Sequence, residues 1–135
     1  MKTTTAARAF AAALIGLSIM AAPKRALADI KDYEFQLVEP TVQAGADRTV
    51  TVRLVNKKTG KAVPDAVIFA SRLDMAPDGM QEMVTKLTSM PGTEPGTYRF
   101  KANFSMAGRW QLSLGAKVQG ENGTVESKLV VTAQK

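Results

Sequence analysis

The sequence predicts an all-β fold, a sandwich of two antiparallel sheets that follows an N-terminal signal peptide. Short segments alternate apolar and polar residues, which is the pattern of half-buried strands. Glycine, proline and asparagine separate these segments at short intervals, as turns do. After the leader, no segment has the apolar spacing of a convincing helix. The chain therefore predicts a single β-domain behind a leader.

The first 28 residues are typical of a secretory signal peptide. A basic start precedes an apolar run of fourteen residues, Ala9 to Ala22, and the triplet "ALA" before Asp29 offers small residues for cleavage. Fourteen helical residues span about 21 Å, less than the roughly 30 Å hydrocarbon core of a membrane. We therefore expect cleavage after Ala28 and release into the periplasm. Lys24 and Arg25 are unusual so close to a cleavage site, so an uncleaved membrane anchor remains the alternative.

Residues 29–135 are expected to form one domain of nearly balanced charge. The 135-residue chain has a formal net charge of +6, but Lys2, Arg8, Lys24 and Arg25 belong to the leader. The domain keeps 14 basic and 12 acidic residues without a basic run, so we expect no nucleic-acid partner. The chain has no cysteine, which an oxidising compartment permits. Its stability must come from the core.

The first half of the domain predicts four strands. Tyr33 to Pro40 alternates and ends at a proline, which cannot continue a ladder. Segments 48–56 and 66–75 alternate in the same way, and Met83 to Met90 is the fourth strand. Because Pro77 and Gly79 interrupt the pattern, we interpret Asp74 to Glu82 as a loop. The inward faces are expected to be Val50, Val52 and Leu54, then Val67, Phe69, Ser71, Leu73 and Met75.

The second half predicts three more strands. Segments 97–104 and 110–118 alternate cleanly, and Asn122-Gly123 is the strongest two-residue signal for a type I′ hairpin leading into the last strand, 124–133. The expected inward residues are Tyr98, Phe100, Ala102, Phe104, Trp110, Leu112, Leu114, Ala116 and Val118. About seven strands, each burying one face, can stack as an immunoglobulin-like sandwich. A transthyretin-like or open-barrel arrangement fits the same pattern.

Several segments resemble the FixH/YtkA-like group of small exported bacterial domains. They are "GKAVPDAVIFASRLDMAPDGM", "EPGTYRFKANFSMAGRWQLSLGAKVQG" and the closing hairpin, which together cover roughly Phe35 to Ala133. The resemblance implies an immunoglobulin-like domain in the periplasm. It also implies an association with copper handling, heavy-metal efflux or the assembly of haem-copper oxidases.

Catalysis is not expected. Without histidine, a serine nucleophile lacks its usual base. Asp74, Asp78 and Glu82 are close in sequence but have no evident cleft for a sugar, so they are interpreted as solvated charges. No glycine-rich phosphate loop opens a helix, and no small-molecule substrate is evident.

Methionines are the best candidate ligands. Met75, Met80 and Met83 fall within nine residues, and Met106 follows in "SMAGRW". Thioethers are soft, neutral ligands that suit Cu(I), which we predict as the bound ion. Neighbouring carboxylates would add attraction for a cation. The alternative is that these methionines fill gaps in the core.

Two functions therefore remain open. The first is a periplasmic protein that binds or delivers Cu(I), which predicts a solvent-reachable methionine cluster at one end of the sandwich. The second is a metal-free interaction module that docks on a membrane complex, such as an RND-type efflux system or a haem-copper oxidase assembly. That function predicts buried methionines and an exposed apolar patch elsewhere.

Overall fold

The computed structural model describes residues 30–135 and consists almost entirely of strands. In chain order the elements are η1 (Ile30–Asp32), β1 (Tyr33–Leu37), β2 (Thr41–Gln43), β3 (Gly45–Asn56), β4 (Val67–Met75), η2 (Ala76–Asp78), β5 (Met80–Thr85), β6 (Leu87–Met90), β7 (Thr97–Phe104), β8 (Gly108–Lys117) and β9 (Val125–Gln134). The predicted leader, residues 1–28, and the predicted new N-terminus, Asp29, lie outside the described residues.

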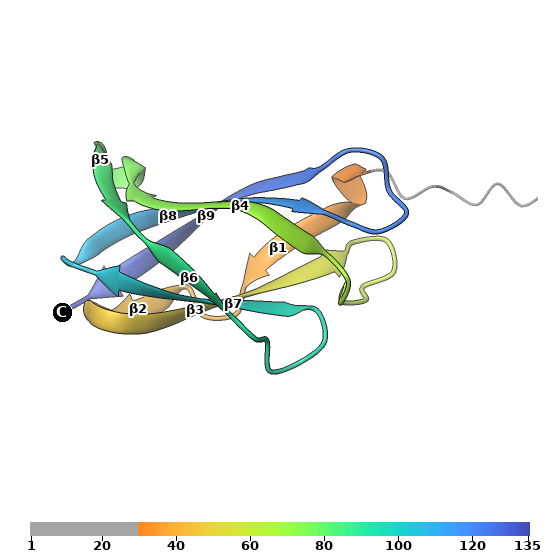
Figure 1. The fold of residues 1–135 in the computed structure, drawn as a ribbon. Coiled ribbons are helices and arrows are strands. Elements are labelled where there is room, and N and C mark those ends of the chain that lie inside the picture. Colours follow the sequence, from red (N-terminus) through yellow and green to blue (C-terminus); the bar gives the residue numbers. More distant parts are fainter. Residues whose placement is uncertain (1–29) are drawn as a thin grey trace, which may run out of the picture.

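Two sheets pack face to face as an immunoglobulin-like sandwich (Figure 1). One has four strands in the order β1-β3-β7-β6, and the other has five in the order β2-β9-β8-β4-β5. The predicted fold class is thus confirmed. Neighbouring strands run antiparallel except β2, which pairs with β9 in parallel. This parallel pair was not predicted, because only three residues of β2 form it.

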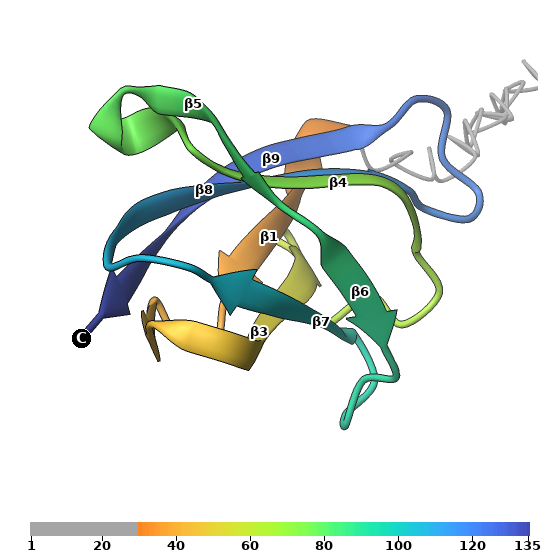
Figure 2. The ribbon, with the colours of Figure 1, turned by 60° about the vertical axis from the view of Figure 1, so that its left-hand side comes forward.

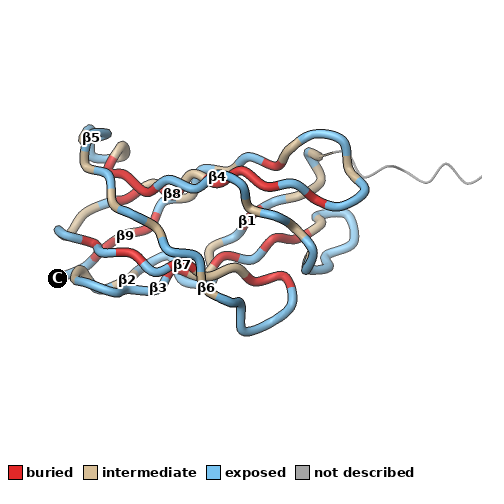
Figure 3. The backbone as a smooth tube through the Cα atoms, viewed as in Figure 1, coloured by how far each residue is buried: buried red, intermediate tan, exposed pale blue. Residues whose placement is uncertain are grey.

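The core lies between the sheets, along the inward faces of β3, β7, β8 and β9 (Figure 3). Val50, Val52 and Leu54 are buried as predicted, and so are Phe100, Ala102, Phe104 and the five inward residues of β8 and its end, Trp110, Leu112, Leu114, Ala116 and Val118. The Phe104 and Trp110 rings meet edge to face with centroids 5.6 Å apart, an arrangement that aromatic quadrupoles favour.

The predicted inward face of β4 is wrong in its first half. Val67 and Phe69 are 60% and 54% exposed, whereas Leu73 and Met75 at the other end are fully buried. The cause is a β-bulge: Ile68 pairs with Ala116 and Ala70 with Gly115, so Phe69 is an extra residue. One extra residue reverses the alternation.

Two other boundaries differ from the prediction. The expected strand Met83 to Met90 is split at Lys86, because β5 belongs to the five-stranded sheet and β6 to the four-stranded one (Figure 2). The link between β8 and β9 spans residues 118–124 and is not a type I′ hairpin. That turn requires positive φ at both central residues, and Gly123 has it while Asn122 does not.

Candidate functional site

Methionines from three segments gather at one end of the sandwich. Met75 ends β4 and Met80 begins β5, and the two are direct partners in the β4–β5 ladder. Met83 lies further along β5, and Met106 lies in the turn between β7 and β8. Figure 1 shows η2 and this turn at the same end of the molecule. We call Met75, Met80, Met83 and Met106 the methionine cluster.

The exposure of these methionines is graded. Met75 is fully buried in the core, Met80 and Met83 are half-buried against it, and Met106 is 40% exposed. Met90 does not join them, because it pairs with Arg99 on β6–β7, five residues before the end of β7. The cluster thus combines a buried core residue with a solvent-reachable one, and neither of the two predicted patterns describes it fully.

The segment between Met75 and Met80 is more ordered than the predicted loop. Asp74 and Met75 are still part of β4, Ala76–Asp78 form a 3-10 turn, and β5 begins at Met80. Pro77 suits the start of this turn, where an amide hydrogen is not needed. Gly79 closes it at φ 75° and donates its N–H to the Ala76 carbonyl at 2.9 Å. Such a left-handed closing residue favours glycine.

Asp78 fastens this turn to β8. Its Oδ2 accepts the backbone N–H of Arg109 at 2.8 Å, and its Oδ1 accepts Nε of the same residue at 2.9 Å. Arg109 also donates from its guanidinium to the Pro77 carbonyl at 2.9 Å. The backbone and side-chain hydrogen bonds from Arg109 lower the pKa of Asp78. We call these three contacts the Asp78–Arg109 clasp.

Asp74 is the second engaged carboxylate. It is 4% exposed, and burial alone would raise its pKa. Hydrogen bonds from Arg72 Nε at 2.7 Å and from the Ala76 backbone N–H at 2.9 Å outweigh burial, and the charge of Lys128 adds to them, so the pKa is lowered. Asp74 and Asp78 therefore each have an arginine partner. Of the three carboxylates expected to attract a cation, only the exposed Glu82 has no arginine partner among the described residues.

Gly108 lets the methionine cluster close against β8. A Cβ placed on it would lie 2.6 Å from Met75 Cε and 2.8 Å from Asp78 Oδ2, and its φ is 147°. Two residues on, Trp110 donates its indole N–H to the Met106 carbonyl at 3.2 Å and so holds the turn that carries Met106. The "MAGRW" sequence thus contains the exposed Met106 and Gly108, which lies close to Met75. It also contains Arg109 of the Asp78–Arg109 clasp and Trp110, whose indole holds the turn.

The donor set of this end is soft. Within residues 30–135, no three side chains of the histidine, cysteine, aspartate and glutamate types are grouped so as to hold a metal ion. Thioethers suit Cu(I), whereas carboxylates suit hard cations, and the carboxylates of Asp74 and Asp78 are bound to arginines. Sequence reasoning did not predict the link between Asp78 and Arg109, because the two residues are 31 positions apart.

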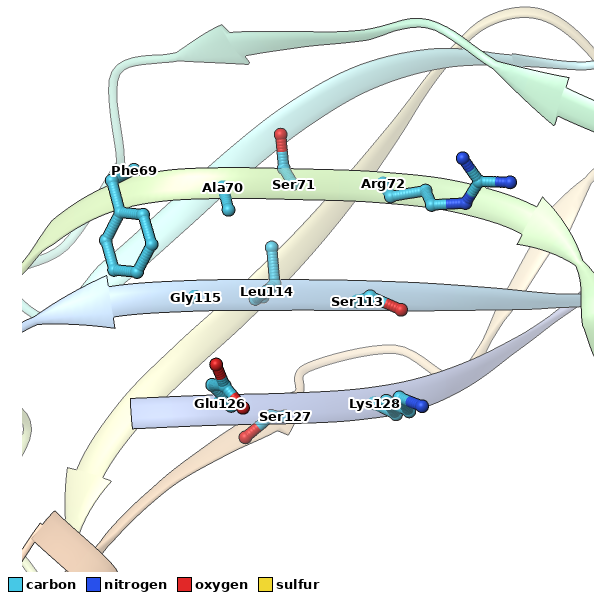
Figure 4. A pocket seen from close by; sticks show the side chains of 10 residues that line it. All are labelled: Phe69, Ala70, Ser71, Arg72, Ser113, Leu114, Gly115, Glu126, Ser127 and Lys128. Atoms are coloured by element: carbon cyan, nitrogen blue, oxygen red, sulfur yellow. The ribbon is translucent and has the colours of Figure 1, made fainter. Parts of the chain in front are cut away.

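A second feature lies elsewhere, on the outer face of the five-stranded sheet. A shallow hollow of ≈ 500 Å³ lies over β4, β8 and β9 and is bordered by Phe69, Arg72, Glu126 and Lys128 (Figure 4). The sequence did not predict it, because the β4 bulge that turns Phe69 outward leaves no signal in the alternation.

Among residues 30–135, no helix is long and apolar enough to cross a membrane.

Comparison with solved structures gives remote likenesses. The filamin domain of Lin-41 is 17% identical with a TM-score of 0.42, over 73% of this chain and 92% of that one. The C-terminal domain of ZirS is 12% identical with a TM-score of 0.45, over 100% of this chain and 88% of that one. No curated protein matches the sequence.

The family comparison covers more than half of the chain. The match begins just before the first described residue, includes all of β1 to β7 and ends at Gly115 within β8. With residues 27–115 matching the family described as YtkA-like, the chain belongs to that family.

Proposed function

We propose that the domain is an exported, periplasmic, non-enzymatic protein that binds one Cu(I) at the methionine cluster and delivers it in copper or heavy-metal homeostasis or efflux. The observation that carries this proposal is the convergence of Met75, Met80, Met83 and Met106 from β4, β5 and the β7–β8 turn on one end of the sandwich. Thioethers form no disulfides, which suits an oxidising compartment.

The graded exposure gives the ligands different roles. Met106 is exposed and Met80 is half-buried, so an arriving ion meets these two thioethers first. Met83 is half-buried and Met75 fully buried, so they complete the site from the core side. A site with one reachable ligand suits a protein that passes its ion on, because an acceptor can displace the outer ligand first.

A Cu(I) titration against a colorimetric chelator tests the proposal. We expect the protein to bind one equivalent and a Met80→Leu/Met83→Leu/Met106→Leu variant to bind none. Leucine keeps the volume and apolar character of methionine, so the fold survives. Met90→Leu, at a methionine outside the cluster, is the matched control and should bind like the parent. Equal uptake by parent and triple variant, or none by either, rejects the site.

Met75→Leu is tested separately because Met75 belongs to the core. Weaker binding at unchanged thermal stability identifies its sulfur as a ligand, whereas parental binding reduces the ligand set to Met80, Met83 and Met106. Thioethers have no proton to lose, so the affinity should change little with pH above about 5.

The open sheet edge favours a second candidate function, a metal-free module that docks on a membrane complex. Among the described residues, β6 pairs only with β7 and is an edge strand of the four-stranded sheet. β5 pairs only with β4 and forms a free edge of the five-stranded sheet, from Met80 to Thr85. Val84 on this edge is 51% exposed. A free edge can accept a strand from a partner, here an RND-type efflux system or a FixH-like role in haem-copper oxidase assembly.

Co-purification with such a complex from membranes separates the two functions. The docking function predicts that Val84→Lys abolishes co-purification and leaves Cu(I) uptake unchanged. If the parent does not co-purify with either complex, the docking function is rejected.

A further inference from the structure

The outer face of the five-stranded sheet has small side chains near its middle. Ala70, Ser113 and Gly115 are small and lie in adjacent strands, since Ala70 pairs with Gly115 and Ser113 precedes it by two residues on β8. The hollow of ≈ 500 Å³ lies over them (Figure 4). A side chain from a second surface can therefore enter this hollow.

Phe69 lines this hollow, and two other exposed apolar side chains lie on β4 and β9. Phe69 and Val67 of β4 are 54% and 60% exposed, and Val130 of β9 is 46% exposed. The Phe69 ring leans over β8, where its Cζ would lie 3.0 Å from a Cβ placed on Gly115. Exposed apolar groups on one face commonly mark an interaction surface.

Two charges of opposite sign stand on the same face. Glu126 pairs across β9–β8 with Gly115 and Lys128 with Ser113. The two are exposed and two residues apart, about 7 Å along the strand. Among the described residues, neither forms a salt bridge. Arg72, the other cation beside the hollow, is already bound to Asp74 and to the Gln81 carbonyl.

We propose that the occupant of this face is a second copy of the chain, packed face to face about a two-fold axis. The axis lies between the two sheets, across the strands, level with Leu114. It brings Lys128 of each copy opposite Glu126 of the other, because the two residues lie on either side of Leu114 in the β8–β9 register. The same operation places Ser113 of each copy opposite Gly115 of the other, so the Phe69 ring that leans over Gly115 packs against Ser113 across the interface.

The arrangement of charges selects a second copy over an unrelated protein. A two-fold interface must be complementary to itself. A glutamate and a lysine that form no salt bridge and lie symmetrically about a centre meet that requirement. Exposed sheet faces packing in this way align their strands within about 30°, which preserves the contact at the centre.

The available area predicts a weak dimer. Four strands about 4.8 Å apart and eight residues of about 3.3 Å each give a footprint of roughly 500 Å². Stable complexes bury about 800 Å² per partner, so we expect a dissociation constant of about 10 to 100 µM. The inference is independent of metal binding.

Sedimentation velocity of the protein, expressed from the full chain and free of metal, tests the proposal between about 1 and 500 µM. We expect a concentration-dependent monomer–dimer equilibrium. Glu126→Lys and Lys128→Glu should each weaken it at least about 10-fold, because each places like charges opposite one another. The double variant Glu126→Lys/Lys128→Glu should restore the dimer, and so should an equimolar mixture of the two single variants.

Restoration is specific to this two-fold pairing, because only facing residues can exchange charges without loss. Both side chains are exposed, so the fold is expected to survive, and near-ultraviolet circular dichroism checks it. Phe69→Ser is the second variant and should also weaken the dimer. A monomer at 500 µM overturns the proposal and leaves the face to another protein or to solvent. The proposal is also overturned if none of the three single substitutions changes the dissociation constant of the dimer. The same holds if the double variant does not restore it.

Discussion

The close approach at Gly108 predicts a large effect of a single methyl group. Gly108→Ala adds a Cβ 2.6 Å from Met75 Cε and 2.8 Å from Asp78 Oδ2. Bonded geometry fixes that Cβ, so one of the two neighbours must move. Met75 is fully buried in the core, so moving it disturbs the packing there. Moving Asp78 disturbs the hydrogen bond that it accepts from the Arg109 N–H.

The magnitude has two parts. Alanine at φ 147° strains the backbone by about 1 to 3 kcal/mol. Overpacking against Met75 adds about 1 to 3 kcal/mol. Gly45→Ala is the matched control, because Gly45 has a φ of 139° and its added Cβ would meet only the side chain of Arg48, which is exposed and can move aside. Gly108→Ala should therefore destabilise the fold by about 1 to 3 kcal/mol more than Gly45→Ala.

Urea unfolding followed by the fluorescence of Trp110, the single tryptophan, measures both variants. The control separates the cost of the positive φ from the cost of the contact. If the two substitutions lower the unfolding free energy equally, the β8 backbone does not approach Met75 as closely as described, and the account of the methionine end is refuted.

Three further predictions follow from the core, the buried carboxylate and the leader. Phe100→Ala or Trp110→Ala should each cost about 3 to 5 kcal/mol of unfolding free energy by leaving a cavity, and circular dichroism melts that match the parent would contradict this. The pKa of Asp74 is lowered in the folded state, so the unfolded state binds more protons as pH falls; stability should decrease from about pH 5 downward, and less steeply in Asp74→Asn. The exported protein should begin at Asp29 and appear in the soluble periplasmic fraction, which mass spectrometry checks, and the intact chain in washed membranes would instead indicate an anchor.

Sequence reasoning succeeded where a pattern is long and local. The alternation of β7 and β8 extends over eight and ten residues, and the inward residues that it predicts, from Phe100 to Ala116, are buried. Burial of one face rewards each alternate apolar residue, so a long pattern leaves little freedom in register. The same reasoning predicted that two sheets must pack together to cover these faces.

The errors occurred where a single residue or a distant contact decides the structure. The bulge at Phe69 is a matter of pairing with β8, and the sequence of β4 alternates as if it were absent. The chain passes from the five-stranded sheet (β5) to the four-stranded sheet (β6) at Lys86, where no glycine or proline marks a break. For the candidate site, the position of Met106 at the same end as the other methionines depends on the contact between β8 and η2. Sandwich topology determines that contact and local sequence does not.

The arginines at the methionine end change the electrostatic expectation for a bound cation. Free Asp74 and Asp78 would attract Cu(I) through their field, and salt would weaken that attraction. Because Arg72 and Arg109 neutralise these carboxylates, little net field remains for salt to screen. The affinity of the proposed site for Cu(I) must then come from the thioethers and from how the fold positions them at this end of the sandwich. It should vary little with ionic strength, and Asp78→Asn should act on the site only by loosening the turn that joins Met75 to Met80.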